Sequence, residues 1–262
     1  MTYTSELIRN GEKEKIWSKY CGYLDLSVQE FMQIQERLLI EQLNTMKDCN
    51  LGKHFLGKHA PKSVEEFRKK VPLTNYGDYV EFLLDRREDD LPKANYRWAR
   101  TSGKSGEYSC KWVPLTDSMY DKIGETVLTG MILCSASEKG DVQVETDDVF
   151  LLAMAPLPYI SSYMCLAIVD LIDVTFVPSL AEGEKMDFGE RLAAGFSRGM
   201  ETGIDYFTGL ASILAKMGEL FESGNSGSKM SLKMLKPKII GRFIKALIRA
   251  KLQKRNILPK DL

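Results

Sequence analysis

Hydrophobic residues recur at helical spacing early in the chain. Ser27 and Glu30 stand three positions apart, which is the spacing of a capping box at a helix start. The pattern behind them predicts a long amphipathic helix over residues 27–47. Its apolar positions are Val28, Phe31, Met32, Ile34, Leu38, Leu39 and Leu43.

Two shorter helices are predicted next. Ser63 and Glu66 repeat the capping-box spacing, and the helix that they open should end before Val71, which precedes a proline. Thr74 is placed to cap a further helix over residues 75–84.

From residue 94 onward, short apolar runs alternate with helical patterns. The runs predict strands at residues 94–101, 111–115, 148–155, 174–177 and 204–207. The helices between and after them are predicted over residues 117–134 (capped by Thr116), 161–172, 182–197 and 210–222. This alternation favours an α/β fold with a mostly parallel sheet flanked by helices. Ligands of such sheets bind beyond the carboxyl ends of the strands.

The last segment has a different pattern. Residues 224–228 form a Gly/Ser-rich hinge, and residues 229–260 hold many Lys and Arg but no Asp or Glu. One helical face there is apolar, and it comprises Ile240, Phe243, Ile244, Leu247, Ile248 and Leu252. Three interpretations stay open: a packed helix with a solvated basic face, a helix on a membrane surface, and a nucleic-acid-binding arm.

The segment between the first two predicted strands carries the clearest chemistry. Residues 101–111 read TSGKSGEYSCK, with two glycines, four Ser or Thr residues and two lysines. Small residues let backbone N–H groups approach an anion, and hydroxyl and ammonium groups add donors, so the composition suits a polyphosphate. A Walker A motif is excluded, because its first glycine would stand at position 98, which is Trp98. The alternative is a plain surface loop between two strands.

The loop and its flanks resemble the phosphate-binding loop of adenylate-forming enzymes. The order Thr101-Ser102-Gly103-Lys104-Ser105-Gly106, followed by Lys111-Trp112-Val113-Pro114, is most similar to the auxin-responsive acyl-acid amido synthetase family. Upstream, residues 67–76 (FRKKVPLTNY) resemble the F-x-x-x-V-P-(L/V)-T-x-Y segment of that family. Residues 203–214 weakly resemble a later strand, turn and helix of the same domain.

The resemblance implies an ATP-dependent ligase. Such an enzyme activates a small carboxylic acid as an acyl-adenylate, with ATP and Mg2+ as cofactors, and transfers the acyl group to an amine or thiol. The residues implied to bind the phosphates are Thr101, Ser102, Gly103, Lys104, Ser105 and Gly106, and Lys111 is implied to be catalytic, adding positive charge as pyrophosphate leaves. The family usually has Ser or Thr where this chain has Lys104, and the stretch before Lys111 is one residue longer and lacks the usual proline.

The family's later Tyr-x-x-Thr-Glu-like motif is absent from the sequence. The resemblance therefore implies the N-terminal part of a longer enzyme, with a single incomplete domain over residues 1–262. Within it we expect a helical lead-in (1–92), an α/β core with the phosphate loop (93–222), and a hinge with a basic amphipathic helix (223–262). We expect this part alone to be inactive, with a partner chain or a C-terminal part supplying the rest. The alternative is a non-catalytic α/β interaction or membrane-surface module derived from such an enzyme.

Composition narrows the class of protein without specifying an activity. Lys plus Arg and Asp plus Glu both number 36, so global charge gives no reason to expect a nucleic-acid partner. The five cysteines form no C-x-x-C pair, and His54 and His59 have too few candidate ligands nearby for a metal site. The longest apolar run, residues 149–160, contains two prolines and is shorter than the ~20 residues of a transmembrane helix. We therefore expect a soluble cytoplasmic protein with reduced thiols, no metal centre and no transmembrane segment.

Overall fold

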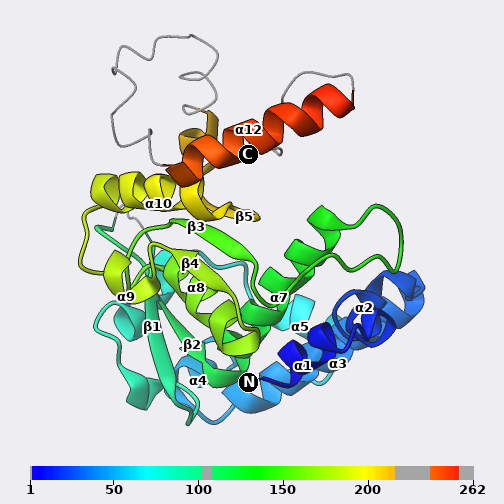
Figure 1. Cartoon of the computed structure of the whole chain (residues 1–262). Coiled ribbons are helices and arrows are strands. Elements are labelled where there is room, and N and C mark those ends of the chain that lie inside the picture. Colours follow the sequence, from blue (N-terminus) through cyan, green and yellow to red (C-terminus); the bar gives the residue numbers. More distant parts are fainter. Residues whose placement is uncertain (1, 102–107, 216–236, 254–262) are drawn as a thin grey trace. The chain divides into compact units, whose positions relative to one another are not determined.

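The computed structural model of the chain describes residues 2–101, 108–215 and 237–253. They fold into two compact units (Figure 1). The first unit combines Thr2–Gln143 with Leu157–Leu171, and the second combines Val144–Pro156 with the chain from Ile172 onward.

The first unit is mostly helical and contains one pair of strands. Its α-helices are α1 (Tyr3–Arg9), α2 (Lys13–Cys21), α3 (Val28–Met46), α4 (Asn50–Leu56), α5 (Val64–Lys70), α6 (Val80–Leu83), α7 (Asp117–Ser135) and α8 (Ile160–Leu171). Its 3-10 helices are η1 (Gly22–Asp25), η2 (Tyr76–Tyr79) and η3 (Glu88–Asp90), and its strands are β1 (Tyr96–Arg100) and β2 (Trp112–Thr116).

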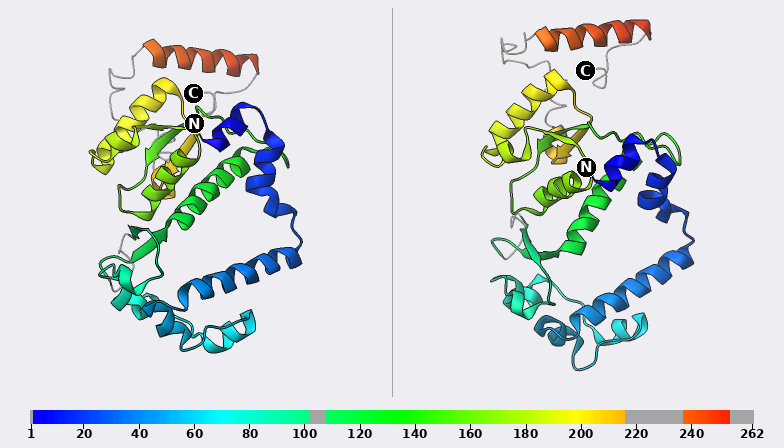
Figure 2. Two further views of the ribbon diagram at one scale, coloured as in Figure 1. Left: turned by 90° about the horizontal axis from the view of Figure 1, so that it is seen from below. Right: turned by 60° about the horizontal axis from the view of Figure 1, so that its bottom comes forward.

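Local capping chemistry starts α3 as the sequence predicts. The Ser27 hydroxyl accepts the backbone N–H of Glu30 at 3.2 Å, and the Glu30 carboxylate accepts the N–H of Ser27 at 2.8 Å. Figure 2 shows α3 running from the α1–α2 pair toward α4 and α5. Of its side chains only Leu43 is buried, and the predicted apolar positions Val28, Phe31, Met32 and Leu38 are exposed.

Two predicted helix starts differ in detail. Ser63 caps α5 through the N–H of Glu66 at 3.1 Å, but the Glu66 carboxylate accepts the N–H of Lys62, so only half of the capping box forms. The next helix is capped by Asn75 and not by Thr74, because the Asn75 side chain accepts the N–H of Gly77 at 2.7 Å. That helix begins as the 3-10 turn η2 and continues as α6.

The two strands of this unit pair with each other in antiparallel register, from Tyr96 opposite Thr116 to Arg100 opposite Trp112. This pair is antiparallel, whereas the sheet predicted for the chain is mostly parallel. Thr101 and Lys111 pair directly beyond the two strands, so the chain reverses its direction between them as in a β-hairpin.

A hydrophobic cluster fixes the elements next to this strand pair. Its buried members are Leu51, Phe82, Leu83 and Leu91, and the half-buried aromatic residues packed on it include Tyr76, Tyr79, Tyr96 and Trp98. The cluster therefore holds η2 and α6 close to β1.

Helices α7 and α8 lie side by side, as Figure 1 shows. As predicted, Thr116 caps α7, since its hydroxyl accepts the N–H of Met119 at 3.2 Å. The close approach depends on Gly124, because a Cβ atom there would lie 2.6 Å from the backbone oxygen of Ala167.

The second unit contains a small parallel sheet of three strands in the order β4-β3-β5. These strands are β3 (Val149–Ala153), β4 (Thr175–Val177) and β5 (Tyr206–Gly209). They confirm the three later predicted strands within a few residues, and the chain as a whole has a mixed α/β fold, though no large parallel sheet is seen in the described residues.

The helices of this unit depart from the prediction at one point. The single helix expected over 182–197 is two helices, α9 (Leu180–Gly183) and α10 (Phe188–Thr202). A capping box formed by Asp187 and Glu190 opens α10, with an N–H to carboxylate distance of 2.8 Å. Residues 211–215 are helical, and the rest of the helix predicted to end at residue 222 lies outside the described residues.

The predicted basic amphipathic helix is confirmed over α12 (Pro237–Leu252), which packs on α10. Ala246 and Ala250 are buried, and the large apolar residues Ile240, Ile244, Leu247, Ile248 and Leu252 are exposed. The apolar side of α12 is thus less covered than the packed-helix interpretation predicts. No described helix is long and apolar enough to cross a membrane.

Candidate functional site

The two ends of the predicted phosphate loop are joined by hydrogen bonds between Thr101 and Lys111, and we call this residue pair the neck of the loop. The N–H of Thr101 donates to the carbonyl of Lys111 at 3.0 Å, and the N–H of Lys111 donates to the Thr101 hydroxyl oxygen at 3.2 Å. These bonds continue the β1–β2 ladder by one pair and bring the first and last predicted site residues together. The other predicted site residues, Ser102, Gly103, Lys104, Ser105 and Gly106, lie outside the described residues.

The residue that follows the neck is held by a side chain from far upstream. The Tyr76 hydroxyl accepts the backbone N–H of Trp112 at 2.8 Å and donates to the carbonyl of Trp112 at 3.3 Å. Tyr76 is the last residue of the F-x-x-x-V-P-L-T-x-Y segment. The two stretches that carry the sequence resemblance therefore meet in the structure.

The ring of Tyr76 also faces two residues of segment 108–112, which we call the loop arm. The Lys111 ammonium lies 5.4 Å from its centroid, within the range of a cation–π contact. The Tyr108 ring meets it edge to face, with centroids 5.5 Å apart. Burial raises the pKa of the Tyr76 phenol above its usual range, so the hydroxyl keeps its proton at neutral pH.

Two arginines add positive charge beside the same strands. The central carbon of the Arg86 guanidinium lies 4.6 Å from the centroid of the Trp112 ring. Arg86 lies in the turn after α6, and its backbone has a positive φ of 56°. The Arg100 guanidinium lies 4.5 Å from the Tyr159 ring and donates to the Tyr159 hydroxyl at 3.1 Å. The Arg100 Nε atom is buried and has no hydrogen-bond partner among the described residues.

The donor set of this neck suits an anion. Lys111 contributes an ammonium group that, in the part of the chain described, forms no ion pair with a carboxylate and contacts only the face of Tyr76. An ammonium group forms charge-assisted hydrogen bonds to phosphate oxygens. The groups at the neck are thus compatible with the phosphates of ATP.

A comparison with known protein families adds a second line of support for this interpretation. Residues 22–142 match the GH3 family N-terminal domain. This segment is therefore similar to the GH3 family. This is the auxin-responsive acyl-acid amido synthetase family, within the adenylate-forming enzymes, so the recognition from sequence is confirmed. A search of curated proteins gave no match.

The GH3 match covers the whole strand pair and both motif segments, including Tyr76, Thr101 and Lys111. The parallel sheet and α12 lie beyond residue 142 and so outside the matched segment. The resemblance suggested for residues 203–214 therefore stays a prediction.

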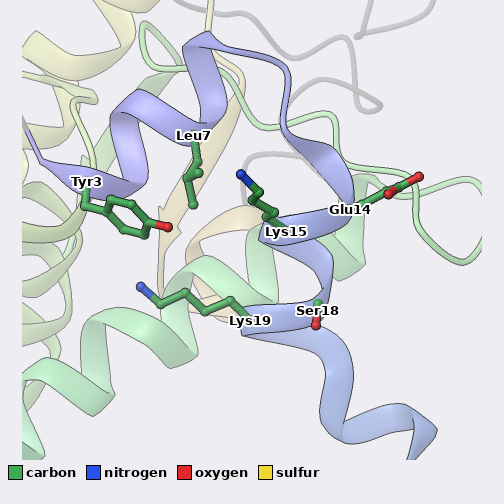
Figure 3. A pocket seen from close by; sticks show the side chains of 6 residues that line it. All are labelled: Tyr3, Leu7, Glu14, Lys15, Ser18 and Lys19. Atoms are coloured by element: carbon green, nitrogen blue, oxygen red, sulfur yellow. The ribbon is translucent and has the colours of Figure 1, made fainter.

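A separate hollow of about 360 Å3 lies on the first two helices (Figure 3). It is lined by Tyr3, Leu7, Glu14, Lys15, Ser18 and Lys19. Its two cations already have partners within the chain, since Lys15 pairs with Glu12 and the Lys19 ammonium lies 5.2 Å from the Tyr3 ring centroid. All six residues precede the GH3 match, and none is a predicted site residue.

Three residues of the site have no role that the sequence alone predicts: Tyr76, Arg86 and Arg100. Tyr76 stands within a motif, and the two arginines stand outside both motif segments. The motif that ends at Tyr76 was the available signal, whereas the arginines stand in no recognisable pattern.

Proposed function

We propose that this chain is the N-terminal portion of an ATP-dependent ligase that activates a carboxylic acid as an acyl-adenylate for transfer to an amine or thiol. The observation that carries the proposal is the meeting of Thr101 and Lys111 at the neck of a Ser/Gly-rich loop, within a segment that matches the GH3 family N-terminal domain. The ligand class is a nucleoside triphosphate, and the partners are a small carboxylic acid and an amine or thiol acceptor.

The reaction that this proposal implies is a displacement at phosphorus. A carboxylate oxygen of the substrate forms a bond to the α-phosphorus of ATP, and the bond from that phosphorus to the α,β-bridging oxygen breaks. The electron pair leaves with pyrophosphate, whose negative charge grows as the bond lengthens. Mg2+ bound to the phosphates neutralises part of that charge when it is present.

In this scheme Lys111 supplies positive charge to the departing pyrophosphate. Preorganised donors aimed at developing charge are among the strongest contributors to catalysis, because they need no reorganisation during the step. Thr101, Ser102, Gly103, Ser105 and Gly106 would surround the β- and γ-phosphates, and Lys104 would add a further contact. We expect this portion alone to bind ATP without turning it over.

The proposal is tested by calorimetric titration of MgATP into the chain. We expect binding in the micromolar-to-millimolar range, and a Lys111→Ala variant should bind about tenfold or more weakly, because it loses a charged contact to phosphate. Lys93→Ala is the matched control, since it removes an exposed lysine of the same unit. Equal affinity of the folded Lys111→Ala variant and the wild type would refute the assignment of this loop.

A further inference from the structure

Tyr76 contacts three residues of the loop arm, Tyr108, Lys111 and Trp112, although it lies 36 residues before Trp112 in the sequence. Its hydroxyl makes two hydrogen bonds to the backbone of Trp112, and its ring faces the Lys111 ammonium. One side chain therefore holds both the backbone just after Lys111 and the charged end of Lys111 itself.

The position of Tyr76 is itself fixed by its neighbours. The Asn75 side chain caps η2, and the Asp78 carboxylate accepts the N–H of Asn75 at 2.7 Å, so the turn is closed on both sides. A Cβ atom on Gly77 would lie 2.8 Å from the Asn75 side-chain oxygen and 3.2 Å from the Tyr108 hydroxyl. An added Cβ would thus disturb the Asn75 cap of the turn, and the Tyr108 hydroxyl would have to move by a few tenths of an ångström.

The protonation state of Tyr76 suits both of its hydrogen bonds. Burial raises the pKa of its phenol, so the hydroxyl remains a donor to the Trp112 carbonyl while its oxygen accepts the Trp112 N–H. A phenylalanine at this position would keep the ring beneath Lys111 and lose both bonds. The hydroxyl can therefore be tested separately from the ring.

We propose that Tyr76 is a positioning residue that sets the Lys111 ammonium against the polyphosphate of ATP. This inference rests on the proposed function, because it requires that Lys111 bind phosphate. Tyr76 acts through Lys111 and not through the ligand, so the effects of changing the two residues should not add.

A double-mutant cycle of ATP affinity tests the coupling. We expect Tyr76→Phe to weaken MgATP binding about three- to tenfold in the wild-type background, the loss typical of a hydrogen-bonded hydroxyl. In the Lys111→Ala background the same change should alter affinity by less than about twofold. Tyr79→Phe is the matched control, since it removes a hydroxyl of the same turn that lies 2.7 Å from the Thr74 hydroxyl.

All titrations are run at a temperature well below the thermal unfolding midpoint of each variant, so that unfolding of a less stable variant is not mistaken for weaker binding. The inference is overturned if Tyr76→Phe binds as tightly as Tyr79→Phe, or if it weakens binding equally with and without Lys111. Those results leave the proposed function intact when Lys111→Ala still weakens binding. Absence of ATP binding in the folded wild type would overturn both.

Discussion

Replacing Gly124 with alanine should destabilise the crossing of α7 and α8. The added Cβ would lie 2.6 Å from the backbone oxygen and 3.1 Å from the backbone carbon of Ala167. Ordinary contacts of a Cβ atom begin near 3.4 Å. The obstacle is backbone within a helix, so the two helices must move apart by about 0.8 Å, and packing errors of this kind typically cost about 1–3 kcal/mol.

The same helix offers a matched control at Gly130. That glycine is exposed, and a Cβ atom there would have no neighbour within 4 Å. Both substitutions gain the helix propensity of alanine over glycine, about 1 kcal/mol. We therefore expect Gly130→Ala to stabilise the protein by about 0.5–1 kcal/mol and Gly124→Ala to lower its stability by up to about 2 kcal/mol once that gain is subtracted.

Equilibrium unfolding in guanidinium chloride, followed by circular dichroism, measures both changes. The informative quantity is the difference in unfolding free energy between the two variants, about 1–3 kcal/mol, because the propensity gain that both variants share cancels in it. If both variants shift the unfolding midpoint in the same direction and by the same amount, the close contact of Gly124 with α8 is refuted.

Three further changes test other parts of the fold by the same unfolding measurement. Thr116→Ala should lower the free energy of unfolding by about 1 kcal/mol, because it removes the cap of α7. Thr116→Ser keeps a capping hydroxyl and should retain most of that free energy. An equal loss in both variants would contradict the capping role. Arg191→Met should cost about 3 kcal/mol or more, because the buried guanidinium donates to the backbone carbonyls of three residues (Met154, Gly183 and Met186); Arg198→Met, which removes an exposed ion-paired arginine of the same helix, should change stability by about 1 kcal/mol or less. Burial raises the pKa of Asp148 from 3.8 to about 6. The folded state then binds a proton more tightly than the unfolded state, so Asp148 lowers stability as the pH rises from about 4 through about 6, and the loss levels off near pH 7. Asp148→Asn should therefore be more stable than the wild type by about 3 kcal/mol at pH 7 and equally stable below pH 4, and an advantage that persists at low pH would refute this.

Helix starts were predictable where the signal is local. Ser27 with Glu30 and Thr116 with Met119 form contacts within one turn of the chain, so residue identity and spacing suffice to place them. The break between α9 and α10 has the same kind of signal in Asp187 and Glu190, and the prediction passed over it.

Contacts between distant segments were not predictable in the same way. The chain reverses its direction between β1 and β2, but the alternation of strands and helices elsewhere in the chain favoured a parallel arrangement. The bonds of Tyr76 to Trp112 join segments with no shared periodicity. The motif located Tyr76 in the sequence, and only the fold shows what its hydroxyl contacts.

Polyphosphate recognition at the neck of the loop is tested most directly by comparing ATP with AMP. Affinities for both nucleotides are measured with Mg2+ for the wild type and for Lys111→Ala, each shown to be folded. We expect the wild type to prefer ATP and Lys111→Ala to lose most of that preference while its affinity for AMP is unchanged, since Lys111 is assigned to the departing pyrophosphate. Equal affinity of the wild type for ATP and AMP, or an unchanged preference in Lys111→Ala, would contradict the assignment.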